Sequence, residues 1–416
     1  MSRKITIAGL DIGSNKITGV VATKDLDTNT LKMEHVAVSD CKGLKGGVVI
    51  DIQQTSDSIQ QVLHELEDSV KKELDNIYIA IRGYHLESFT NHGAYNISRV
   101  DKEITADDIY FAIENAKSVP VKNDNDIINT IPQNFSVDKQ QGIPNPEGME
   151  GSLLEVDLHV TTGSSTHLNN LLRAIERIGY KVDVTLYGLI ALGDCALTQE
   201  EKDLGALIID IGGDTMSVGL YFDGGLRFSR DIPYGADLIT RDIAYGVRTS
   251  RTNAKNLKEE YAVAHPSYLG DEEEIKVEDL DGKTTNSIKK TFLLDVVQPR
   301  VEELFTEVKR ALDRSGYSEV PAIGVLTGGG SVMPGMKEMC SEVLGLKEVR
   351  SGSVQRDLMI SDETFFAPEY STAVSLVVYE SERNHYGDYS RVGVQTSGSV
   401  LGKVSKMFKK MDFFGG

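Results

Sequence analysis

Apolar residues follow two spacings along this chain. Short apolar runs, which are typical of buried strands, lie at residues 5–10, 17–22, 77–81, 182–186, 205–211, 217–222 and 320–326. Apolar positions three or four residues apart predict helices at 53–74, 167–178, 189–197 and 371–378, and a mostly helical stretch at 236–305. Within that stretch, the acidic residues 271–274 are expected to form a solvated loop. The mixture of strands and helices predicts an α/β protein.

Residues 82–162 have a different pattern from the segments around them. A strand-like stretch precedes Thr105, which with Asp108 resembles a capping box that has Asp in place of the usual Glu or Gln. The helix that begins there is expected to end near Lys117, and strands are predicted at 127–137 and 153–160. We therefore expect this segment to be a self-contained β-α-β-β insertion.

The most informative pattern is an internal repeat. Two segments about 200 residues apart each consist of an apolar strand, a turn that begins Asp-Ile-Gly, and a second apolar strand. The turns are residues 11–16 and 210–215, and a third glycine-rich turn, residues 327–330, follows the strand at 320–326. Either Asp-Ile-Gly turn alone is more often an ordinary turn, but two of them in duplicated halves indicate a shared site.

These three turns have the chemistry of a nucleotide site. Consecutive backbone N–H groups in a tight glycine turn bind phosphate oxygens, because glycine lets the backbone approach closely. The leading carboxylates of Asp11 and Asp210 suit Mg²⁺ held through water beside the phosphates. We predict phosphate contacts from both Asp-Ile-Gly turns and nucleoside contacts from the third. The predicted ATP-binding residues of the turns are Asp11, Gly13, Ser14, Asn15, Lys16, Asp210, Gly212, Gly213, Thr215, Gly328, Gly329 and Gly330.

Composition narrows the class of partner. The formal net charge of −19 argues against a general nucleic-acid binder, because phosphate backbones attract basic surfaces. The 3 cysteines form neither a disulfide framework nor a metal-binding pattern, as in a cytosolic protein. The first residues lack the apolar stretch of a secretory signal, and no run approaches the roughly 18 apolar residues of a membrane-spanning helix. Any membrane contact is therefore expected to be peripheral.

The end of the chain predicts such a contact. Residues 384–399 are polar and aperiodic, as in a linker, and residues 400–416 carry a local charge of +3, which leaves −22 for the remainder. At about 100° per residue, the apolar residues of this tail fall in a sector about 140° wide, as in an interfacial helix. Docking of this helix on its own domain is the alternative. The predicted membrane residues are Leu401, Val404, Met407, Phe408, Met411 and Phe414, with Lys403, Lys406, Lys409 and Lys410 at anionic lipid.

The three turns together resemble the superfamily of actin, heat-shock chaperones and sugar kinases. Within it, the whole chain is most similar to the FtsA family of bacterial cell-division proteins. The similarity is carried by residues 232–235 (IPYG), 239–244 (ITRDIA), 368–374 (PEYSTAV) and, inside the insertion, 145–148 (NPEG). The resemblance implies an actin-like (ribonuclease H-like) duplicated two-domain fold with an inserted β-α-β-β subdomain IC.

The family's subdomains can be assigned along the chain. The resemblance implies that subdomain IA consists of residues 1–81, 163–204 and 361–383, and that IC is 82–162. Subdomain IIA would be 205–240 and 305–360, and IIB would be 241–304. The linker (384–399) and the amphipathic membrane-targeting helix (400–416) complete the chain.

The resemblance also implies a function. It implies an ATP- and Mg²⁺-binding protein that polymerises on the cytoplasmic face of the cell membrane at the division site. IIB would bind the C-terminal peptide of FtsZ, IC would face other division proteins, and the tail would anchor the assembly to lipid. Gly235 and Lys258 are expected at the nucleotide.

Three positions depart from the family pattern. Asp214 stands where the family usually has glycine, and Ser217 stands where aspartate is common. Lys255 replaces an acidic residue that contacts the ribose in the family, so Lys255 is not expected to make that contact. We identify no catalytic base and expect weak ATP hydrolysis at most. A PilM-like pilus assembly adaptor and, with less support, an ATP-dependent phosphotransferase of the same superfamily are the alternatives.

Overall fold

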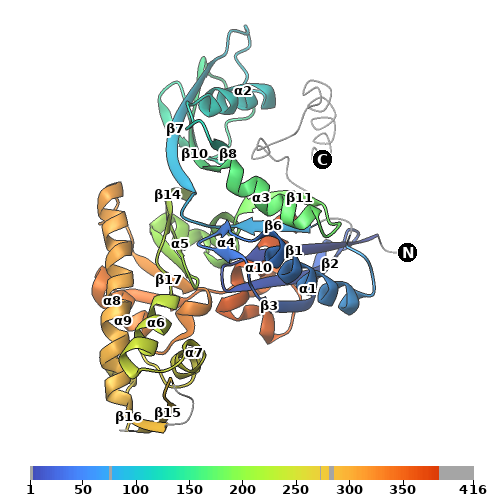
Figure 1. The fold of residues 1–416 in the computed structure, drawn as a ribbon. Helices are drawn as coiled ribbons and strands as arrows, with labels where there is room; N and C mark the ends of the chain where they lie inside the picture. Colours follow the sequence, from blue (N-terminus) through green and yellow to red (C-terminus); the bar gives the residue numbers. More distant parts are fainter. Residues whose placement is uncertain (1–2, 75–76, 272, 281–284, 384–416) are drawn as a thin grey trace.

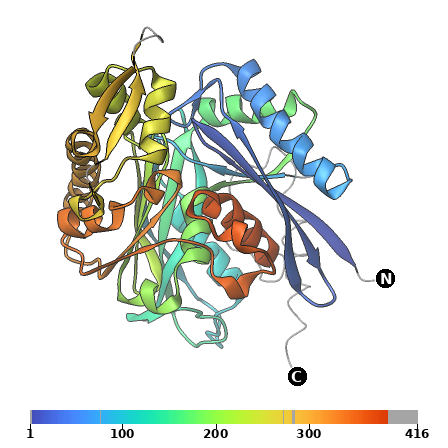
Figure 2. The same cartoon turned by 90° about the horizontal axis from the view of Figure 1, so that it is seen from below.

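The computed structural model describes residues 3–74, 77–271, 273–280 and 285–383. They form two lobes that lie side by side and a smaller unit that projects from them (Figures 1 and 2). The predicted linker and the predicted membrane residues lie outside the described residues. Among the described helices, none is both long and apolar enough to cross a bilayer.

Lobe I is built on a five-stranded sheet. Its order is β11 (Val182–Tyr187), β6 (Ile77–Ile81), β1 (Lys4–Ile12), β2 (Lys16–Asp25) and β3 (Thr30–Asp40). Strands β1, β2 and β3 are antiparallel neighbours, whereas β6 and β11 run parallel to β1. Alternate residues of the central strands point to opposite faces of the sheet. On each face they pack into an apolar cluster, so both faces are buried. Helices α1 (Ile52–Val70) and α3 (Ser165–Glu176) cover one face, and α10 (Ser371–Arg383) covers the other.

Lobe II repeats this topology. Its sheet has the order β14 (Gly225–Ile232), β13 (Met216–Phe222), β12 (Ala206–Ile211), β17 (Ile323–Thr327) and β18 (Glu348–Ser351). Again three antiparallel strands are followed by two parallel ones. The equivalent strand order confirms the duplication that the two Asp-Ile-Gly segments predict. The helices of this lobe are α6 (Asp237–Val247), α7 (Arg251–Glu260), α8 (Lys290–Ser315) and α9 (Met336–Leu344).

The predicted insertion forms a separate sheet. Its elements are β7 (Glu87–Asn96), α2 (Ala106–Lys117), β8 (Asn125–Val137), β9 (Gln140–Ile143) and β10 (Leu153–Ser164), in the sheet order β7-β10-β8-β9. Helix α2 packs on β7 and β10 over an apolar cluster of its own. The Asp108 carboxylate accepts a 2.7 Å hydrogen bond from the Thr105 N–H, as the capping pattern predicts. The β-α-β-β order is confirmed, with β9 as one additional short strand.

Helix α4 (Gly188–Ala196) joins the lobes. It packs against α10 of lobe I and β13 of lobe II, and its leucines share one apolar cluster with both sheets. The remaining short elements are α5 (Gln199–Leu204), the hairpin of β4 (Leu44–Lys45) and β5 (Val48–Val49), and five 3-10 turns: η1 (Pro266–Tyr268), η2 (Gly329–Val332), η3 (Arg356–Leu358), η4 (Glu363–Phe366) and η5 (Pro368–Tyr370).

The structure corrects the sequence-based elements at several places. The stretch predicted as mostly helical contains a hairpin, β15 (Glu274–Glu278) and β16 (Thr285–Lys289), so Glu274 lies in a strand and not in a loop. Ile275 and Val277 are buried between exposed charged neighbours, and this period of two favours a strand over a helix. Strand β3 was not predicted, and α8 continues ten residues past the predicted end at 305 to Ser315.

Candidate functional site

The two Asp-Ile-Gly turns have the same local structure. In the first, the Gly13 N–H donates to the Lys16 carbonyl at 3.1 Å, and in the second the Gly212 N–H donates to the Thr215 carbonyl at 2.9 Å. Each turn joins the first two strands of its sheet, with Ile12 opposite Ile17 and Ile211 opposite Met216. The duplicated sheets therefore present equivalent turns to one another.

The predicted phosphate residues of the two turns meet across the boundary between the lobes. Asn15 of lobe I donates from Nδ2 to Asp237 Oδ1 of lobe II at 2.8 Å. A Cβ on Gly213 would lie 2.3 Å from Asn15 Nδ2, so a larger residue there would displace the Asn15 side chain. Ser14 accepts a hydrogen bond from the Gly47 N–H at 3.2 Å. The turns thus lie at a single site.

The predicted Gly235 supports the second turn. A Cβ at this position would lie 2.2 Å from the Gly213 carbonyl oxygen. The next two N–H groups, of Ala236 and Asp237, donate to the carbonyls of Gly212 and Gly213, each at 2.9 Å. The start of α6 is therefore fixed to the phosphate turn of lobe II.

The third glycine-rich turn lies against the same strand end. A Cβ on Gly328 would lie 2.2 Å from Asp210 Oδ1, and one on Gly330 would lie 2.4 Å from Ile211 Cγ2. The Gly328 N–H donates to the Pro368 carbonyl at 3.0 Å, and Gly329 is exposed. The turn predicted for the nucleoside is thus adjacent to the phosphate turn of lobe II.

Lysines from both lobes contribute positive charge here. Burial lowers the pKa of Lys258, Asp237 opposes this shift, and Lys255 and Lys16 lower the pKa further. Lys16 belongs to lobe I and Lys258 to lobe II, so both lobes contribute positive charge near this boundary. Positive charge from both lobes favours a bound anion.

Arg82 is the residue that the sequence analysis missed. It follows β6 directly, and β6 runs parallel beside β1, where Ala80 is opposite Asp11. The Arg82 guanidinium therefore reaches both predicted metal-associated carboxylates: Nη2 lies 2.7 Å from Asp11 Oδ2 and 3.0 Å from Asp210 Oδ2. The end of a parallel strand beside an Asp-Ile-Gly strand was the available sequence signal.

A second missed group lies beside Arg82. Asp231 of β14 accepts from the Gly83 N–H at 2.5 Å and from the Tyr187 hydroxyl at 2.6 Å. Burial raises the pKa of Asp231, while these donors and Arg82 oppose the shift. Lobe II therefore fixes the backbone that follows Arg82.

The carboxylates fit a divalent ion held through water. The buried Asp11 Oδ1 has no hydrogen-bond partner in the described structure and can accept from metal-bound water. Burial raises the pKa of Asp11, Arg82 lowers it and Asp210 raises it. No cluster of three or more His, Cys, Asp or Glu side chains suited to direct metal binding occurs among the described residues. Mg²⁺, when bound, would neutralise phosphate charge.

Asp214, the first departure from the family pattern, has a definite contact. Its Oδ2 accepts a 3.1 Å hydrogen bond from the Gly46 N–H, which belongs to the β4–β5 hairpin of lobe I. The acidic side chain thus joins the hairpin to the phosphate turn of lobe II.

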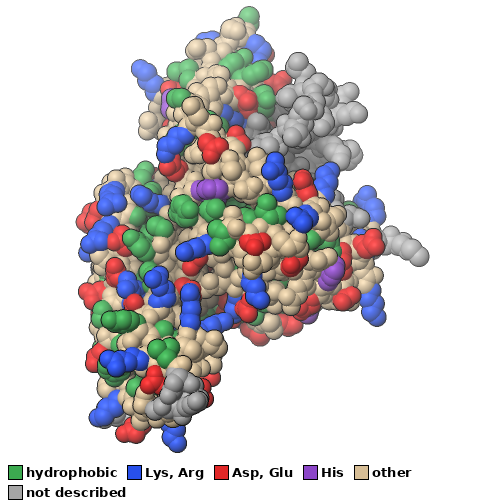
Figure 3. Space-filling model, in the orientation of Figure 1, with side chains coloured by type: hydrophobic (Ala, Val, Ile, Leu, Met, Phe, Trp, Pro, Cys, Tyr) green, Lys and Arg blue, Asp and Glu red, His purple; other side chains and the backbone are tan. Residues whose placement is uncertain are grey.

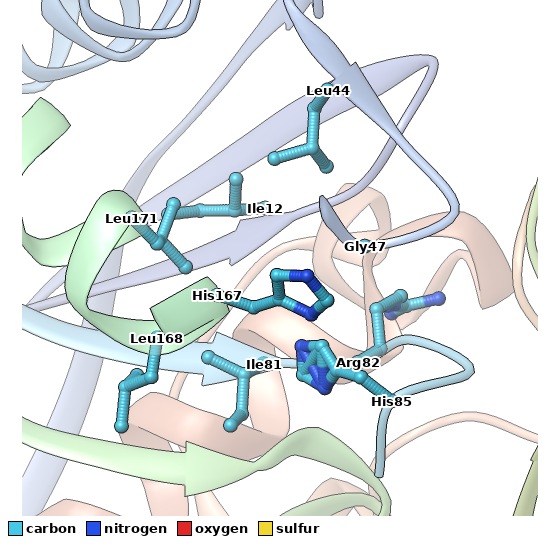
Figure 4. Close-up of a pocket in the computed structure, with 9 residues that line it drawn as sticks. All are labelled: Ile12, Leu44, Gly47, Ile81, Arg82, His85, His167, Leu168 and Leu171. Atoms are coloured by element: carbon cyan, nitrogen blue, oxygen red, sulfur yellow. The ribbon is translucent and has the colours of Figure 1, made fainter. Parts of the chain in front are cut away.

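A small cavity lies in lobe I behind Arg82 (Figure 4). Its volume of about 10 Å³ suits roughly one water molecule and not a nucleotide. The rings of His85 and His167 face each other in it, with centroids 5.1 Å apart. Burial, followed by the proximity of His167, lowers the pKa of His85 to about 4. Arg82 lines both this cavity and the charged site between the lobes, but the other residues around the cavity are apolar residues, a glycine and the two histidines.

Solved structures with a similar fold cover most of the chain. The protein in a PilM–PilN type IV pilus biogenesis complex matches with a TM-score of 0.62 and 17% identity, over 90% of this chain and 98% of that one. MreB5 of Spiroplasma citri bound to ADP matches with a TM-score of 0.53 and 11% identity, over 91% and 96%. With its duplicated sheets, the chain has the predicted actin-like α/β fold.

Comparison with related sequences identifies the family more narrowly than the fold does. The family model of the cell division protein FtsA matches residues 207–375, and that of an SHS2 domain inserted in FtsA matches residues 83–162. The cell division protein FtsA of Pseudomonas aeruginosa is 33% identical over 92% of this chain and 90% of its own length. FtsA of Escherichia coli K12 is 30% identical over 98% of both chains, and FtsA of Borreliella burgdorferi 31% over 99% of both. The chain therefore belongs to the FtsA family of cell division proteins.

Proposed function

We propose that this protein binds MgATP between its lobes, polymerises beneath the cytoplasmic membrane at the division site, and anchors FtsZ filaments there through residues 400–416. The proposal of nucleotide binding rests on one observation, which is that Asp11, Asp210 and the two phosphate turns lie together at one site. Backbone donors, flanking lysines and a close-packed glycine turn are the groups that a polyphosphate and its nucleoside require.

ATP acts in this proposal as a ligand that favours the closed arrangement of the lobes. Direct contacts between the lobes, such as Asn15 with Asp237, depend on the same turns that would bind phosphate. A ligand that contacts both turns stabilises the state in which they are close. Head-to-tail assembly of closed molecules would then produce filaments. We assign no catalytic base, so the proposed activity is slow hydrolysis at most.

The FtsZ peptide is assigned to residues 241–304. Within this range Tyr245 of α6 is 89% exposed and Phe292 of α8 is 42% exposed. The helices pack together nearby, because a Cβ on Gly246 would lie 3.1 Å from Val296 Cγ2. Exposed aromatic side chains on adjacent helices suit a short peptide with apolar anchors. We propose that the insertion, residues 82–162, contacts other division proteins.

The proposed tether follows from the tail's sequence. An apolar sector with lysines around it favours insertion into an anionic headgroup layer. One short helix binds moderately, and a filament that presents many copies gains avidity. A pilus adaptor has the same fold, but identities of 30–33% over nearly the full length support the division role. ATP turnover above about 1 s⁻¹ would instead support the phosphotransferase alternative.

Recruitment of labelled FtsZ to anionic liposomes with ATP tests this function. The full chain, a chain ending at Ser399 and a full-length Tyr245→Ala variant are compared. We expect the full chain to bind lipid and recruit FtsZ, the shortened chain to bind neither, and Tyr245→Ala to bind lipid with at least about tenfold weaker FtsZ recruitment. Equal recruitment by the full and shortened chains would refute the tether.

A further inference from the structure

The insertion bridges the two lobes. The chain links it to lobe I at both ends, because β6 precedes it and α3 follows it. Its strands β7, β8 and β10 pack on β14, which is an edge strand of the lobe II sheet. In Figure 1 the insertion stands over this strand. The insertion is therefore attached to one lobe and rests on the other.

Side chains of the insertion bind the backbone of β14. The Ser88 hydroxyl donates to the Ser229 carbonyl, and the Gln133 amide donates to the Leu226 carbonyl. Among the described strands, β14 has a partner on one side only, so these side chains serve backbone groups of an edge strand. The Ser229 hydroxyl also donates to Ser88 Oγ at 2.9 Å and lies 2.9 Å from His159 Nε2. Ser229 and His159 are only 2% and 1% exposed, so water does not compete for these hydrogen bonds while the insertion is docked.

The same strand also contacts the candidate nucleotide site. Asp231 lies two residues after Ser229, so its side chain points to the same face of β14. Its carboxylate accepts a hydrogen bond from the Gly83 N–H at 2.5 Å. Gly83 directly follows Arg82, whose Nη2 lies 3.0 Å from Asp210 Oδ2. Strand β14 thus contacts the insertion through Ser229 and the segment that reaches the nucleotide site through Asp231.

The insertion is firmly held on lobe I. Asn129 of β8 accepts a 2.7 Å hydrogen bond from the Tyr187 N–H at the end of β11, and β10 continues directly into α3. The two segments that connect the insertion to lobe I also pack on each other, because a Cβ on Gly163 would lie 2.7 Å from Leu86 Cδ2. The insertion therefore stays with lobe I when the lobes separate, and the separation has to break its contacts with β14.

We propose that the insertion is a strut that positions the two lobes for nucleotide binding. Its hydrogen bonds with β14 stabilise the closed arrangement of the lobes, so Ser88 and Gln133 are positioning residues of the nucleotide site. The inference rests on the ATP site proposed above and adds the insertion to it. Because coupling between two sites is reciprocal, bound nucleotide strengthens the docking of the insertion on β14. A partner that draws the insertion away from β14 weakens nucleotide binding for the same reason.

Equilibrium binding of a fluorescent, N-methylanthraniloyl-labelled ATP in the presence of Mg²⁺ tests the positioning role. Ser88→Ala combined with Gln133→Ala removes both hydrogen bonds to the β14 backbone, and we expect it to weaken binding by at least about fivefold. Asn115→Ala combined with Ser118→Ala is the matched control, because these two side chains donate to backbone carbonyls within the insertion. The control should bind within about twofold of the natural chain.

Hydrogen exchange provides a second test, which the natural chain alone can decide if the double variant does not fold. With the Mg²⁺-bound analogue, amides of residues 87–92 in β7 and 225–230 in β14 should exchange at least about threefold more slowly. Helix α2, residues 106–117, packs on β7 and β10 within the insertion and should be unaffected.

Two results would overturn the strut and leave the nucleotide site intact. One is a Ser88→Ala, Gln133→Ala variant that binds the analogue as tightly as the natural chain. The other is unchanged exchange of both β7 and β14 when the natural chain binds the analogue. If the natural chain does not bind the analogue at all, the proposed ATP site itself is wrong, and the strut with it.

Discussion

At the scale of single residues, the buried hydrogen bond between Tyr187 and Asp231 joins the lobes. Burial and then Asp231 raise the pKa of Tyr187, so its hydroxyl stays protonated and donates to the carboxylate at 2.6 Å. Hydrogen bonds to charged groups contribute about 1.5–3 kcal/mol. We expect Tyr187→Phe to lower the free energy of unfolding by about that amount, measured by urea denaturation.

Tyr180→Phe is the matched control for this prediction. Tyr180 also donates to a carboxylate, Glu67 Oε2 at 2.9 Å, but at a partly exposed position within lobe I. Water can replace that hydrogen bond, so we expect a loss below about 1 kcal/mol. Equal effects of the two substitutions would mean that the Tyr187 bond gains nothing from burial.

His159 predicts a dependence of stability on pH. Burial lowers its pKa to about 4, whereas an unfolded histidine titrates near about 6.5. The unfolded chain therefore binds the proton more readily, and this contribution to stability is fully present above about pH 6.5 and is lost as the pH falls toward 4. At pH 5 the loss is about 2 kcal/mol. His159→Gln should remove that part of the acid sensitivity in urea unfolding at pH 7 and pH 5.

The glutamine can keep the contact without titrating. His159 Nε2 lies 2.9 Å from Ser229 Oγ of β14, within reach of a glutamine amide. His92→Gln is the control, because His92 is exposed and its hydrogen bond with Asp157 raises its pKa. Its contribution has the opposite sign: it is present at low pH and lost as the pH rises. An unchanged acid sensitivity in His159→Gln would contradict the assignment.

The residue pattern of the sequence singled out the glycines and aspartates of the candidate site but not Arg82, Tyr187 or Asp231. A glycine in an Asp-Ile-Gly turn is needed for the local backbone geometry of the turn, and a sequence motif can indicate such a turn. Arg82, Tyr187 and Asp231 meet only because β6, β11 and β14 end at the same place. Such a meeting depends on strand order, which the sequence pattern alone does not determine.

At the scale of elements, the β4–β5 hairpin is held to lobe II by one side chain, Asp214. Asp214→Gly removes the acceptor for the Gly46 N–H. Because this hydrogen bond is only partly buried, it contributes about 1 kcal/mol, less than the buried Tyr187 bond. We expect amide hydrogen exchange of residues 43–50 to accelerate by about fivefold while the remainder of lobe I stays unchanged. Mass spectrometry of peptic peptides measures this.

The Asp214→Asn variant keeps a carbonyl acceptor and serves as the control. Its exchange should stay within about twofold of the natural chain. If Asp214→Gly exchanges no faster than Asp214→Asn, the hairpin is held by packing, for example of Gly47 on Arg82, and not by this hydrogen bond.

Elements with strong apolar runs were predicted well, whereas two alternating strands, β3 and β15, were missed. Strands β1, β2, β12 and β13 are buried on both faces, so they contain continuous apolar stretches. In β3 and β15 buried and exposed residues alternate, and charged side chains separate the apolar ones. The period of two was present in both, but short helical spacings around β15 obscured it.

At the scale of the whole molecule, the duplicated topology explains why two turns singled out in the sequence lie together at one candidate site. Equivalent strand orders place the ends of β1 and β12 toward one another, so two weak motifs become one site. The direct contacts across it, such as Asn15 with Asp237, were beyond prediction because they depend on how the lobes are docked. Acidic and basic side chains are intermingled on the face shown in Figure 3. The predicted excess of positive charge in residues 400–416 therefore contrasts with the remainder of the chain.

This contrast predicts that lipid binding depends on the tail lysines and not on total charge. Substituting Lys403, Lys406, Lys409 and Lys410 by Gln should weaken binding to anionic vesicles by at least about a hundredfold, because each lysine contributes about 1 kcal/mol. The control substitutes four exposed lysines of the lobes by Gln, namely Lys4, Lys72, Lys337 and Lys347. It changes the net charge equally and should alter binding by less than about threefold. Co-sedimentation with anionic and zwitterionic vesicles measures both. A control that loses binding as strongly as the tail variant would assign the lipid contact to the lobes, since only a contact outside residues 400–416 could respond to those four positions.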